Sequence, residues 1–407
     1  MDTTSKHIFT RGAHHLMIPV FTLWISAACT ESIPVREPTG IPIAHAKLLT
    51  YNTLHGLEPS GLTVKASESK EERQARLDLQ FRELSVIQPD IMLLQEVNPL
   101  PEMADRYVAA MKDFGLRYAA VHQVDACGVR VAPGLAVVPG LNNGLAVLAK
   151  APLLVRKVKG LKLSGGIGRC DDYMGFQTGE LRYALISEIE NPNTGRKLLT
   201  VSLHLHSGIE RNAFFIQKIN EYVDAGKVRR EDFEEIVVEL EKSQERRLEE
   251  IRRLLKEIQK LNTNDAYVGV LVGGDFNFEP DDPEYRELEG AGLKDTYAMA
   301  SPETEVYTLD PQRNVIAGKG IREVPPALLA AMKRLPESLQ EQILEGYQKG
   351  ISEARRVDFL FLLRNPSDVL PHGCFRHELF GHAEADSPGS DHYGVLVTYF
   401  ADPTQCR

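Results

Sequence analysis

Eight short runs of apolar or alternating residues set the strongest limit on how this chain can fold. They are rich in Val, Ile, Leu and Tyr, are bounded by turn residues, and span residues 46–51, 91–94, 144–148, 183–189, 198–205, 266–272, 357–363 and 394–399. Several of these predicted strands follow one another with no helical pattern between them, so strand and helix do not alternate strictly. The pattern therefore favours two packed sheets with outer helices over a doubly wound parallel sheet.

Three other stretches have helical periodicity. Glu71–Ile87 reads as an amphipathic helix that ends at Gln88-Pro89. Residues 208–262 are strongly charged with apolar residues at helical spacing, and residues 316–352 contain an amphipathic run after Pro325-Pro326. We interpret these two stretches as insertions into one catalytic domain at 43–403. They form either solvated surface helices or a cap that faces the substrate or a membrane.

The beginning of the chain resembles an export signal. Lys6 and Arg11 precede an apolar run, Leu16–Ile25, that closes with small residues and is too short to span a bilayer. Residues 1–28 are therefore predicted to be a signal peptide and residues 29–42 a proline-containing linker. Cys29 stands where a bacterial lipoprotein carries its lipidated cysteine, so the protein is expected to be secreted, periplasmic or a lipid-anchored outer-membrane protein.

Four further cysteines are available for pairing in an exported protein. The chain contains Cys127, Cys170, Cys374 and Cys406 besides Cys29. Their connectivity does not follow from spacing alone. No Cys-x-x-Cys or Cys/His spacing indicates structural zinc.

Polar residues gather where the predicted strands end. The motifs are Thr50-Tyr51-Asn52-Thr53, Leu94-Gln95-Glu96-Val97, Leu203-His204-Leu205-His206-Ser207, Gly273-Gly274-Asp275-Phe276-Asn277, Val357-Asp358-Phe359 and Ser390-Asp391-His392. A charged residue at the end of a buried strand is costly unless it is paired or bound to a metal. Paired glycines permit a close approach of the backbone. One such motif is weak evidence, but six along one chain predict a functional rim.

In this order the motifs resemble the endonuclease/exonuclease/phosphatase superfamily. Leu-Gln-Glu-Val, Gly-Asp-Phe-Asn and Ser-Asp-His are the strongest matches, and residues 143–150 resemble another strand of the family. The resemblance implies an α/β fold, a four-layered α/β/β/α sandwich of two packed sheets with outer helices and the active site at one rim. It also implies a metal-dependent phosphoesterase that hydrolyses its substrate with an activated water.

The resemblance also assigns roles to individual residues. Glu96 is the expected principal ligand of Mg²⁺, for which Mn²⁺ is a possible substitute, with Asn52 and Asp391 nearby; oxygen ligands of this kind suit a hard cation. His204, Asp275, Asn277, Asp358 and His392 are the expected catalytic residues. Either Asp275 or His392 could be the general base, and Asp358 is expected to orient His392. His206 and Asn314 are expected around this site, with His206 a weaker alternative to His204.

The substrate is less constrained by the sequence. Residues 306–314 followed by Arg356-Val357-Asp358-Phe359 resemble a sphingomyelinase-type pattern, although Leu309 stands where an aromatic residue is usual. The net charge of −10 argues against a broad basic face for nucleic acid. A phospholipid or sphingolipid headgroup at a membrane surface is therefore favoured. An exported nuclease acting on nucleic acid, an inositol-phosphate phosphatase and, last, a non-catalytic binding module are the alternatives.

Overall fold

The computed structural model describes most of the chain beyond the predicted leader. The described residues are 45–60, 63–127, 130–132, 135–136, 142–165, 168–169, 176–177, 181–207, 220–227, 229–263, 266–300, 306–320, 329, 332–333, 335–364, 373–381 and 388–406. The predicted signal peptide, Cys29, the linker and Cys170 lie outside them.

The first sheet joins both ends of the described chain. Its order is β17 (Cys374–Phe380), β18 (Gly394–Phe400), β1 (His45–Asn52), β4 (Ile91–Val97), β8 (Asn142–Lys150) and β5 (Tyr118–Cys127). Strands β1 and β4 are parallel and all other neighbours are antiparallel. The carboxyl ends of β1 and β4 therefore meet at one edge, beside the start of β18.

The second sheet repeats this plan. Its order is β15 (Lys294–Asp295), β16 (Asp358–Arg364), β14 (Gly269–Asp275), β13 (Arg196–His204), β12 (Leu181–Asn191) and β9 (Leu154–Gly165). Only β13 and β14 run parallel. Three short hairpins accompany the sheets: β2 (Leu57–Ser60) with β3 (Thr63–Ala66), β6 (Arg130–Ala132) with β7 (Leu135–Ala136), and β10 (Gly168–Arg169) with β11 (Phe176–Gln177).

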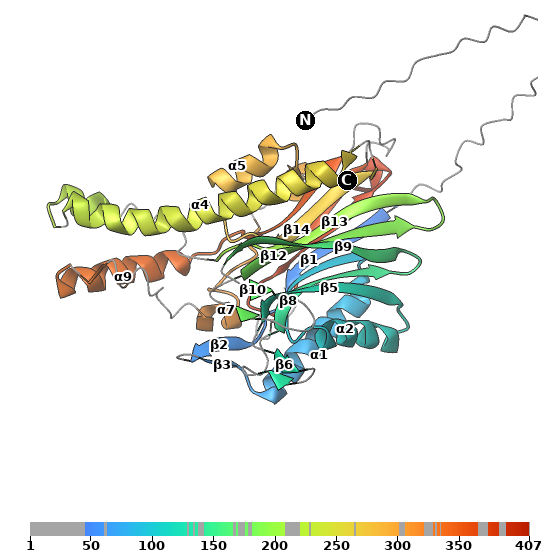
Figure 1. Cartoon of the computed structure of the whole chain (residues 1–407), viewed down its shortest axis with the longest axis horizontal. Coiled ribbons are helices and arrows are strands. Elements are labelled where there is room, and N and C mark those ends of the chain that lie inside the picture. Colours follow the sequence, from blue (N-terminus) through green and yellow to red (C-terminus); the bar gives the residue numbers. More distant parts are fainter. Residues whose placement is uncertain are drawn as a thin grey trace, which may run out of the picture. The chain divides into compact units, whose positions relative to one another are not determined.

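Helices cover the outer face of each sheet (Figure 1). Helices α1 (Lys70–Ile87) and α2 (Glu102–Asp113) pack on the first sheet, and α4 (Arg230–Leu261) and α5 (Pro283–Gly290) pack on the second. Further helices within the described ranges include α6 (Thr296–Ala300), α7 (Val315–Gly320), α9 (Glu337–Ile351) and the 3-10 turn η2 (Pro403–Cys406). No helix within the described ranges is long and apolar enough to span a membrane.

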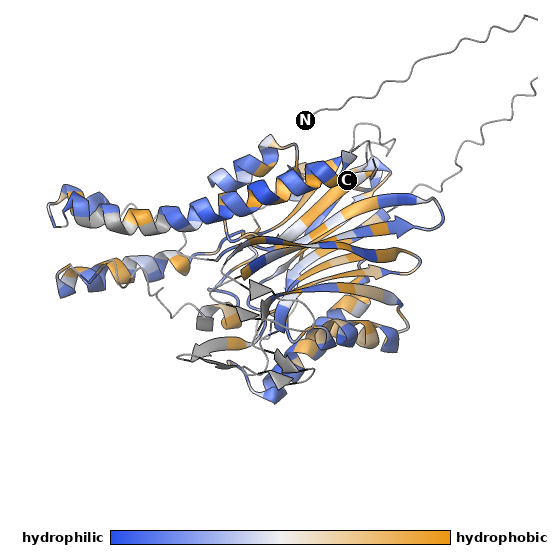
Figure 2. Ribbon diagram, viewed as in Figure 1, coloured by the Kyte–Doolittle hydropathy of each residue, from blue (hydrophilic) through white to orange (hydrophobic). Residues whose placement is uncertain are grey.

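Three apolar cores separate the four layers, as expected from the alternation of side chains along strands. One core lies between α1, α2 and the first sheet, and another between α4, α5 and the second sheet. The third lies between the two sheets and includes Leu48, Leu93, Leu271 and Leu360. Figure 2 shows the apolar strands and the polar outer surfaces of the helices. The expected α/β sandwich of two packed sheets with outer helices is confirmed.

Within the segment 208–262, the described residues include helix α4. The second half of α4 is one of the four layers, because Ile251, Leu254 and Ile258 are buried against the second sheet. The first half extends past the ends of the strands, and α9 extends from the same end (Figure 1). Strands β5, β9 and β17 were not among the predicted runs. In β9 the alternation is interrupted at Arg156-Lys157 and most side chains are half-exposed, which weakens the strand pattern.

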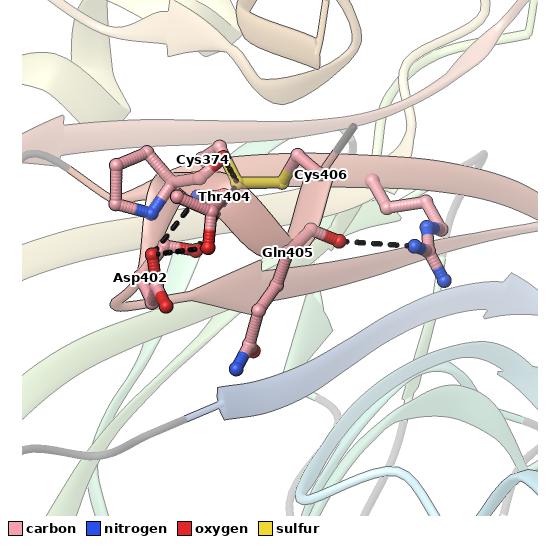
Figure 3. The surroundings of a disulfide bond; sticks show 7 residues. Cys374, Asp402, Thr404, Gln405 and Cys406 are labelled. Atoms are coloured by element: carbon pink, nitrogen blue, oxygen red, sulfur yellow. Dashed lines mark hydrogen bonds between the residues drawn. A yellow bond between two sulfur atoms is a disulfide. The ribbon is translucent and has the colours of Figure 1, made fainter.

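A disulfide closes the carboxyl end of the chain (Figure 3). Cys374 at the start of β17 is bonded to Cys406 in η2. The Asp402 carboxylate accepts hydrogen bonds from the backbone N–H and hydroxyl of Thr404, at 2.9 and 2.8 Å. Arg376 donates to the carbonyl of Gln405 at 3.1 Å. This bond settles one pairing that spacing left open.

Candidate active site

The strand ends carry polar side chains into the space between the sheets. Side chains two apart on a strand share a face, so the polar residues at the rim continue the same rows that form the inter-sheet core. The rows run from Leu48 to Asn52 on β1, from Leu271 to Asp275 on β14, and from Leu360 to Asp358 on β16. The site thus lies on the inter-sheet face, directly above an apolar core.

A polar layer separates that core from the rim. The side chain of Gln95 donates to Thr50 Oγ1 at 3.2 Å and to Ser202 Oγ at 3.1 Å, which links the two sheets. All three residues are fully buried. A Cβ on Gly273 would come within 2.7 Å of side chains from both sheets, and one on Gly274 within 2.0 Å of the Leu203 carbonyl. The two glycines therefore permit the close approach expected of them.

Glu96 reaches the rim because β4 is irregular there. Strict alternation would place Gln95 and Glu96 on opposite faces, but the register with β8 shifts between Leu94 and Val97, and Glu96 has a φ of +56°. Bulges of this kind re-aim side chains, and left-handed backbone in a residue other than glycine is typical of functional sites. The Glu96 carboxylate consequently lies 4.0 Å from His204 Nδ1 on the other sheet.

His55 is a neighbour of Glu96 that sequence reasoning did not single out. Its backbone N–H donates to Glu96 Oε2 at 2.9 Å, and its Nε2 lies 3.7 Å from the same oxygen. Burial is the largest single effect and opposes ionisation of Glu96, but His55, His204 and His392, together with the hydrogen bond from the His55 N–H, lower the pKa of Glu96 to about 2. Glu96 is thus a carboxylate at neutral pH. In the sequence, only its position three residues after Asn52 indicates that His55 lies near the site.

Asp275 lies at the centre of the rim. Its Oδ2 accepts a hydrogen bond from Asn52 Nδ2 at 3.1 Å and lies 3.5 Å from His204 Nε2 and 3.8 Å from His392 Nε2. Burial raises the pKa of Asp275 to about 7, and the nearby carboxylates of Asp358 and Glu96 act in the same direction. The two acids of this site therefore differ near neutral pH: Glu96 is ionised, whereas Asp275 can both take up and release a proton.

Asp358 and His392 form a buried pair across the two sheets. His392 Nδ1 and Asp358 Oδ2 are 2.7 Å apart. Burial alone would lower the pKa of His392, but Asp358 and Asp275 together raise it well above its usual value. Thr308 fixes Asp358 by accepting hydrogen bonds from the N–H groups of Val357 and Asp358, both at 3.1 Å. The expected Asp–His arrangement is present in this geometry.

Asn277 adopts a left-handed conformation, with a φ of +53°. Its N–H donates to Asp275 Oδ1 at 3.0 Å, and its side-chain amide donates to the Leu205 carbonyl at 3.1 Å. Asn277 therefore connects the turn after β14 to the segment after β13. Asn277 is itself a predicted catalytic residue, and Leu205 directly follows another, His204.

The loop that carries Asp391 and His392 is held from two sides. Ser390 donates to the Asn52 carbonyl at 2.7 Å, and the buried Asn314 amide donates to the Ser390 carbonyl at 2.9 Å. Burial raises the pKa of Asp391, and the negative charge of Glu96 adds to that shift. Asp391 and Glu96 are thus close enough to repel each other when both are ionised. Asn314 lies behind the loop, consistent with its expected place around the site.

His204 and His206 lie in different environments. His204 ends β13 and is buried between Glu96 and Asp275. His206 lies beyond the strand, where its N–H donates to Glu250 at 2.9 Å and its carbonyl accepts from Arg247 at 3.4 Å, both on α4. The strand ends before His206, so the alternation that would have given the two histidines one face does not continue. The geometry favours His204.

Two groups of side chains at this rim could hold a divalent cation. The predicted set of Asn52, Glu96 and Asp391 offers only oxygen donors, and a cation between Glu96 and Asp391 would relieve their repulsion. Asp275, Asp358 and His392 also offer ligand atoms within 4.8 Å of one another. The second group includes an imidazole nitrogen, that of His392, which suits a hard cation less well than oxygen does. The first set therefore fits a hard cation better.

The matching family model identifies the class of protein. A model described as the Endonuclease/Exonuclease/phosphatase family matches residues 49–392, which include every residue of the rim described above. The chain belongs to this family, whose members generally hydrolyse phosphodiester or phosphate ester bonds. No curated protein matches the chain.

Several solved structures match the chain at low sequence identity. Truncated TDP2 from Caenorhabditis elegans matches with 15% identity and a TM-score of 0.49, over 88% of this chain and 98% of that chain. TDP2 from D. rerio, complexed with a single-strand DNA product, matches with 16% identity and a TM-score of 0.48, over 88% and 99%. An endonuclease/exonuclease/phosphatase from Bacteroides vulgatus matches with 15% identity and a TM-score of 0.49, over 87% and 98%.

Proposed function

We propose that this protein is an exported, divalent-metal-dependent phosphodiesterase that cleaves a phospholipid or sphingolipid headgroup. One observation carries the hydrolytic part of the proposal. An ionised acid beside other oxygen donors, Glu96 with Asn52 and Asp391, lies across the rim from the Asp275, His204 and His392 group. Hydrolysis of a phosphodiester needs positive charge beside the phosphoryl oxygens and a proton acceptor for water. A cation held by the Glu96 side would supply the first, and Asp275 on the other side supplies the second.

Each side chain then has a defined task. Mg²⁺ bound by Asn52, Glu96 and Asp391 would supply positive charge to the phosphoryl and leaving oxygens. Asp275, between the two histidines, orients the attacking water and accepts its proton. His204 and His392 donate hydrogen bonds to the phosphoryl oxygens, and Asp358 holds His392 in the required orientation.

Charge on the projecting helices favours a lipid over a nucleic acid. Glu231, Glu234, Glu241 and Glu245 on the first half of α4 outnumber Arg230 and Lys242 among the described side chains. Helix α9 adds Glu337, Glu341 and Glu345 against Lys349. Contacts to phosphates dominate the affinity of proteins for nucleic acid, and acidic helices at the site end would repel that backbone. The sphingomyelinase-like pattern around Thr308 supports the same choice.

Export is the second part of the proposal. The basic and then apolar beginning of the chain supports it, and so does the Cys374–Cys406 disulfide, because such bonds persist in oxidising compartments. Cys29 would supply a lipid anchor. Replacing Cys29 with Ser should then release the protein from the membrane fraction, whereas unchanged fractionation would remove the anchor from the proposal.

Phosphocholine release from sphingomyelin liposomes tests the substrate. We expect release that depends on Mg²⁺, stops with a chelator, and is lost in Glu96→Ala. Plasmid nicking is measured in parallel. Nicking without phosphocholine release would replace the lipid substrate with a nucleic acid, and release of inorganic phosphate from inositol phosphates would replace it with a phosphomonoester. No metal binding and no turnover on any of these substrates would favour the non-catalytic alternative.

A further inference from the structure

Helix α1 contacts the rim of the site from outside, through polar side chains on its buried face. Arg76 and Gln80 are one turn apart, and both are buried among apolar neighbours such as Leu77 and Leu84. Arg73 lies one turn before Arg76 and is half-buried. Buried guanidinium and amide groups are costly unless their hydrogen bonds are satisfied. The hydrogen-bond partners of these three side chains therefore indicate their role.

The partners of Arg76 lie in two different loops. Its Nη1 donates to the carbonyls of Thr53 at 2.7 Å and Gly389 at 3.4 Å, and its Nη2 donates to the carbonyl of Leu54 at 3.2 Å. Thr53 and Leu54 follow Asn52, and Gly389 precedes Asp391 by two residues. Glu68 holds the guanidinium in place, with Arg76 Nε 2.9 Å from Glu68 Oε2. Arg76 thus connects the loops that carry two of the three predicted metal ligands.

Gln80 repeats this bridge, and Arg73 adds the third loop. The Gln80 amide donates to the carbonyls of Thr53 and Gly389, and its oxygen accepts from Tyr107. Arg73 donates to the carbonyl of Asn98, two residues after Glu96. The Asn98 amide in turn donates to the His55 carbonyl at 3.1 Å. All three loops are therefore held by their backbone carbonyls from one helix.

The start of α1 is itself fixed. Ser69 Oγ accepts from the N–H of Glu72 at 3.1 Å, and Glu72 accepts from the N–H of Ser69 at 2.7 Å, which forms a capping box. The cap anchors the first turn, which carries Arg73 and leads directly into the turn of Arg76. The helix can therefore serve as a rigid reference for the loops.

We propose that Arg73, Arg76 and Gln80 are positioning residues that set the spacing of Asn52, Glu96 and Asp391 for a divalent cation. The inference rests on the proposed metal-dependent function. A cation with near-octahedral demands tolerates little error in the position of its ligands, so loops held only by their own backbone would bind it weakly. Side chains that orient metal ligands from behind typically affect metal affinity about 10–100-fold.

The test measures metal binding without turnover. Mn²⁺ is titrated into the metal-free full chain and the free ion is followed by electron paramagnetic resonance. We expect Arg76→Met to raise the dissociation constant for Mn²⁺ about 10–100-fold, and Arg76→Lys to restore part of the loss. Gln80→Met and Arg73→Met are expected to weaken binding as well. Arg73→Met serves if Arg76→Met does not fold, because Arg73 is only half-buried.

Arg253→Met on α4 is the control for removing an arginine that donates to a backbone carbonyl away from the site. Arg253 also donates to a backbone carbonyl, that of Leu163 at 2.9 Å, but it contacts none of the three loops. The dissociation constant of Arg253→Met for Mn²⁺ should equal that of the unsubstituted protein. Folded variants at Arg76 and Arg73 that bind Mn²⁺ as tightly as this control would overturn the inference. Failure of the unsubstituted protein to bind Mn²⁺, or retained binding in Glu96→Ala, would instead contradict the proposed metal site itself.

Discussion

The two sheets contribute opposite kinds of acid to one rim. On the first sheet, neighbouring histidines outweigh burial and lower the pKa of Glu96 to about 2. On the second sheet, burial and neighbouring carboxylates raise the pKa of Asp275 to about 7. The difference teaches that position relative to neighbouring charges, and not residue type, determines which carboxylate suits a cation and which suits a proton.

The largest expected effect on turnover comes from replacing either of these two acids with a neutral side chain. Glu96→Ala and Asp275→Asn should each lower kcat about 10³-fold or more, because each removes one side of the rim. They should differ in metal binding, which Glu96→Ala abolishes and Asp275→Asn retains. Steady-state kinetics and Mn²⁺ titration make the distinction. Equal loss of Mn²⁺ binding in both variants would mean that Asp275 is also a ligand and that the two sides do not divide their tasks.

The Asp358–His392 pair gives the next largest effect. His392→Ala and Asp358→Asn are each expected to lower kcat about 10²–10⁴-fold with nearly unchanged melting temperatures. Because the two residues act as one hydrogen-bonded unit, the double variant should be little slower than the worse single variant. Additive losses would show that the residues act separately. Circular dichroism melting curves check that the fold is retained.

The two histidines near the end of β13 sharpen the comparison within one sheet. His204→Ala should lower kcat about 10²-fold, since its ring lies between Glu96 and Asp275. His206→Ala should cost less than about ten-fold, because α4 contacts the backbone of this residue, which the substitution keeps. Turnover on liposomes ranks the pair. If His206→Ala turns over more slowly than His204→Ala, His206 and not His204 is the essential histidine.

Much of this site was predictable because strand periodicity and short motifs are local. The polar ends of β1, β4, β13, β14 and β16 could be read from apolar runs, and their meeting at one rim follows from two packed sheets. The irregularity at Glu96 was not predictable, since a bulge depends on pairing with β8. The same limit applies to Arg76 and Gln80. They resemble the solvent face of an amphipathic helix until the loops that they contact are known.

The smallest effect on turnover is expected far from the rim, at His377 on β17. Burial, together with the charge of Arg356, lowers the pKa of His377 to about 4. The unfolded chain would bind a proton at this histidine near its ordinary pKa of about 6.5, so between about pH 6.5 and 4 the unfolded state holds more protons. The free energy of unfolding should therefore fall as the pH drops through this window, by at most about 3 kcal/mol.

His377→Gln tests this assignment and separates it from the acids of the rim. Urea unfolding at pH 7 and pH 4.5 should show a smaller difference in the free energy of unfolding for the variant than for the unsubstituted protein. The kcat at pH 7 should be unchanged, because His377 packs on Tyr297 and contacts none of the rim residues described above. An identical acid sensitivity in both proteins would mean that His377 does not contribute and that other titratable groups are responsible.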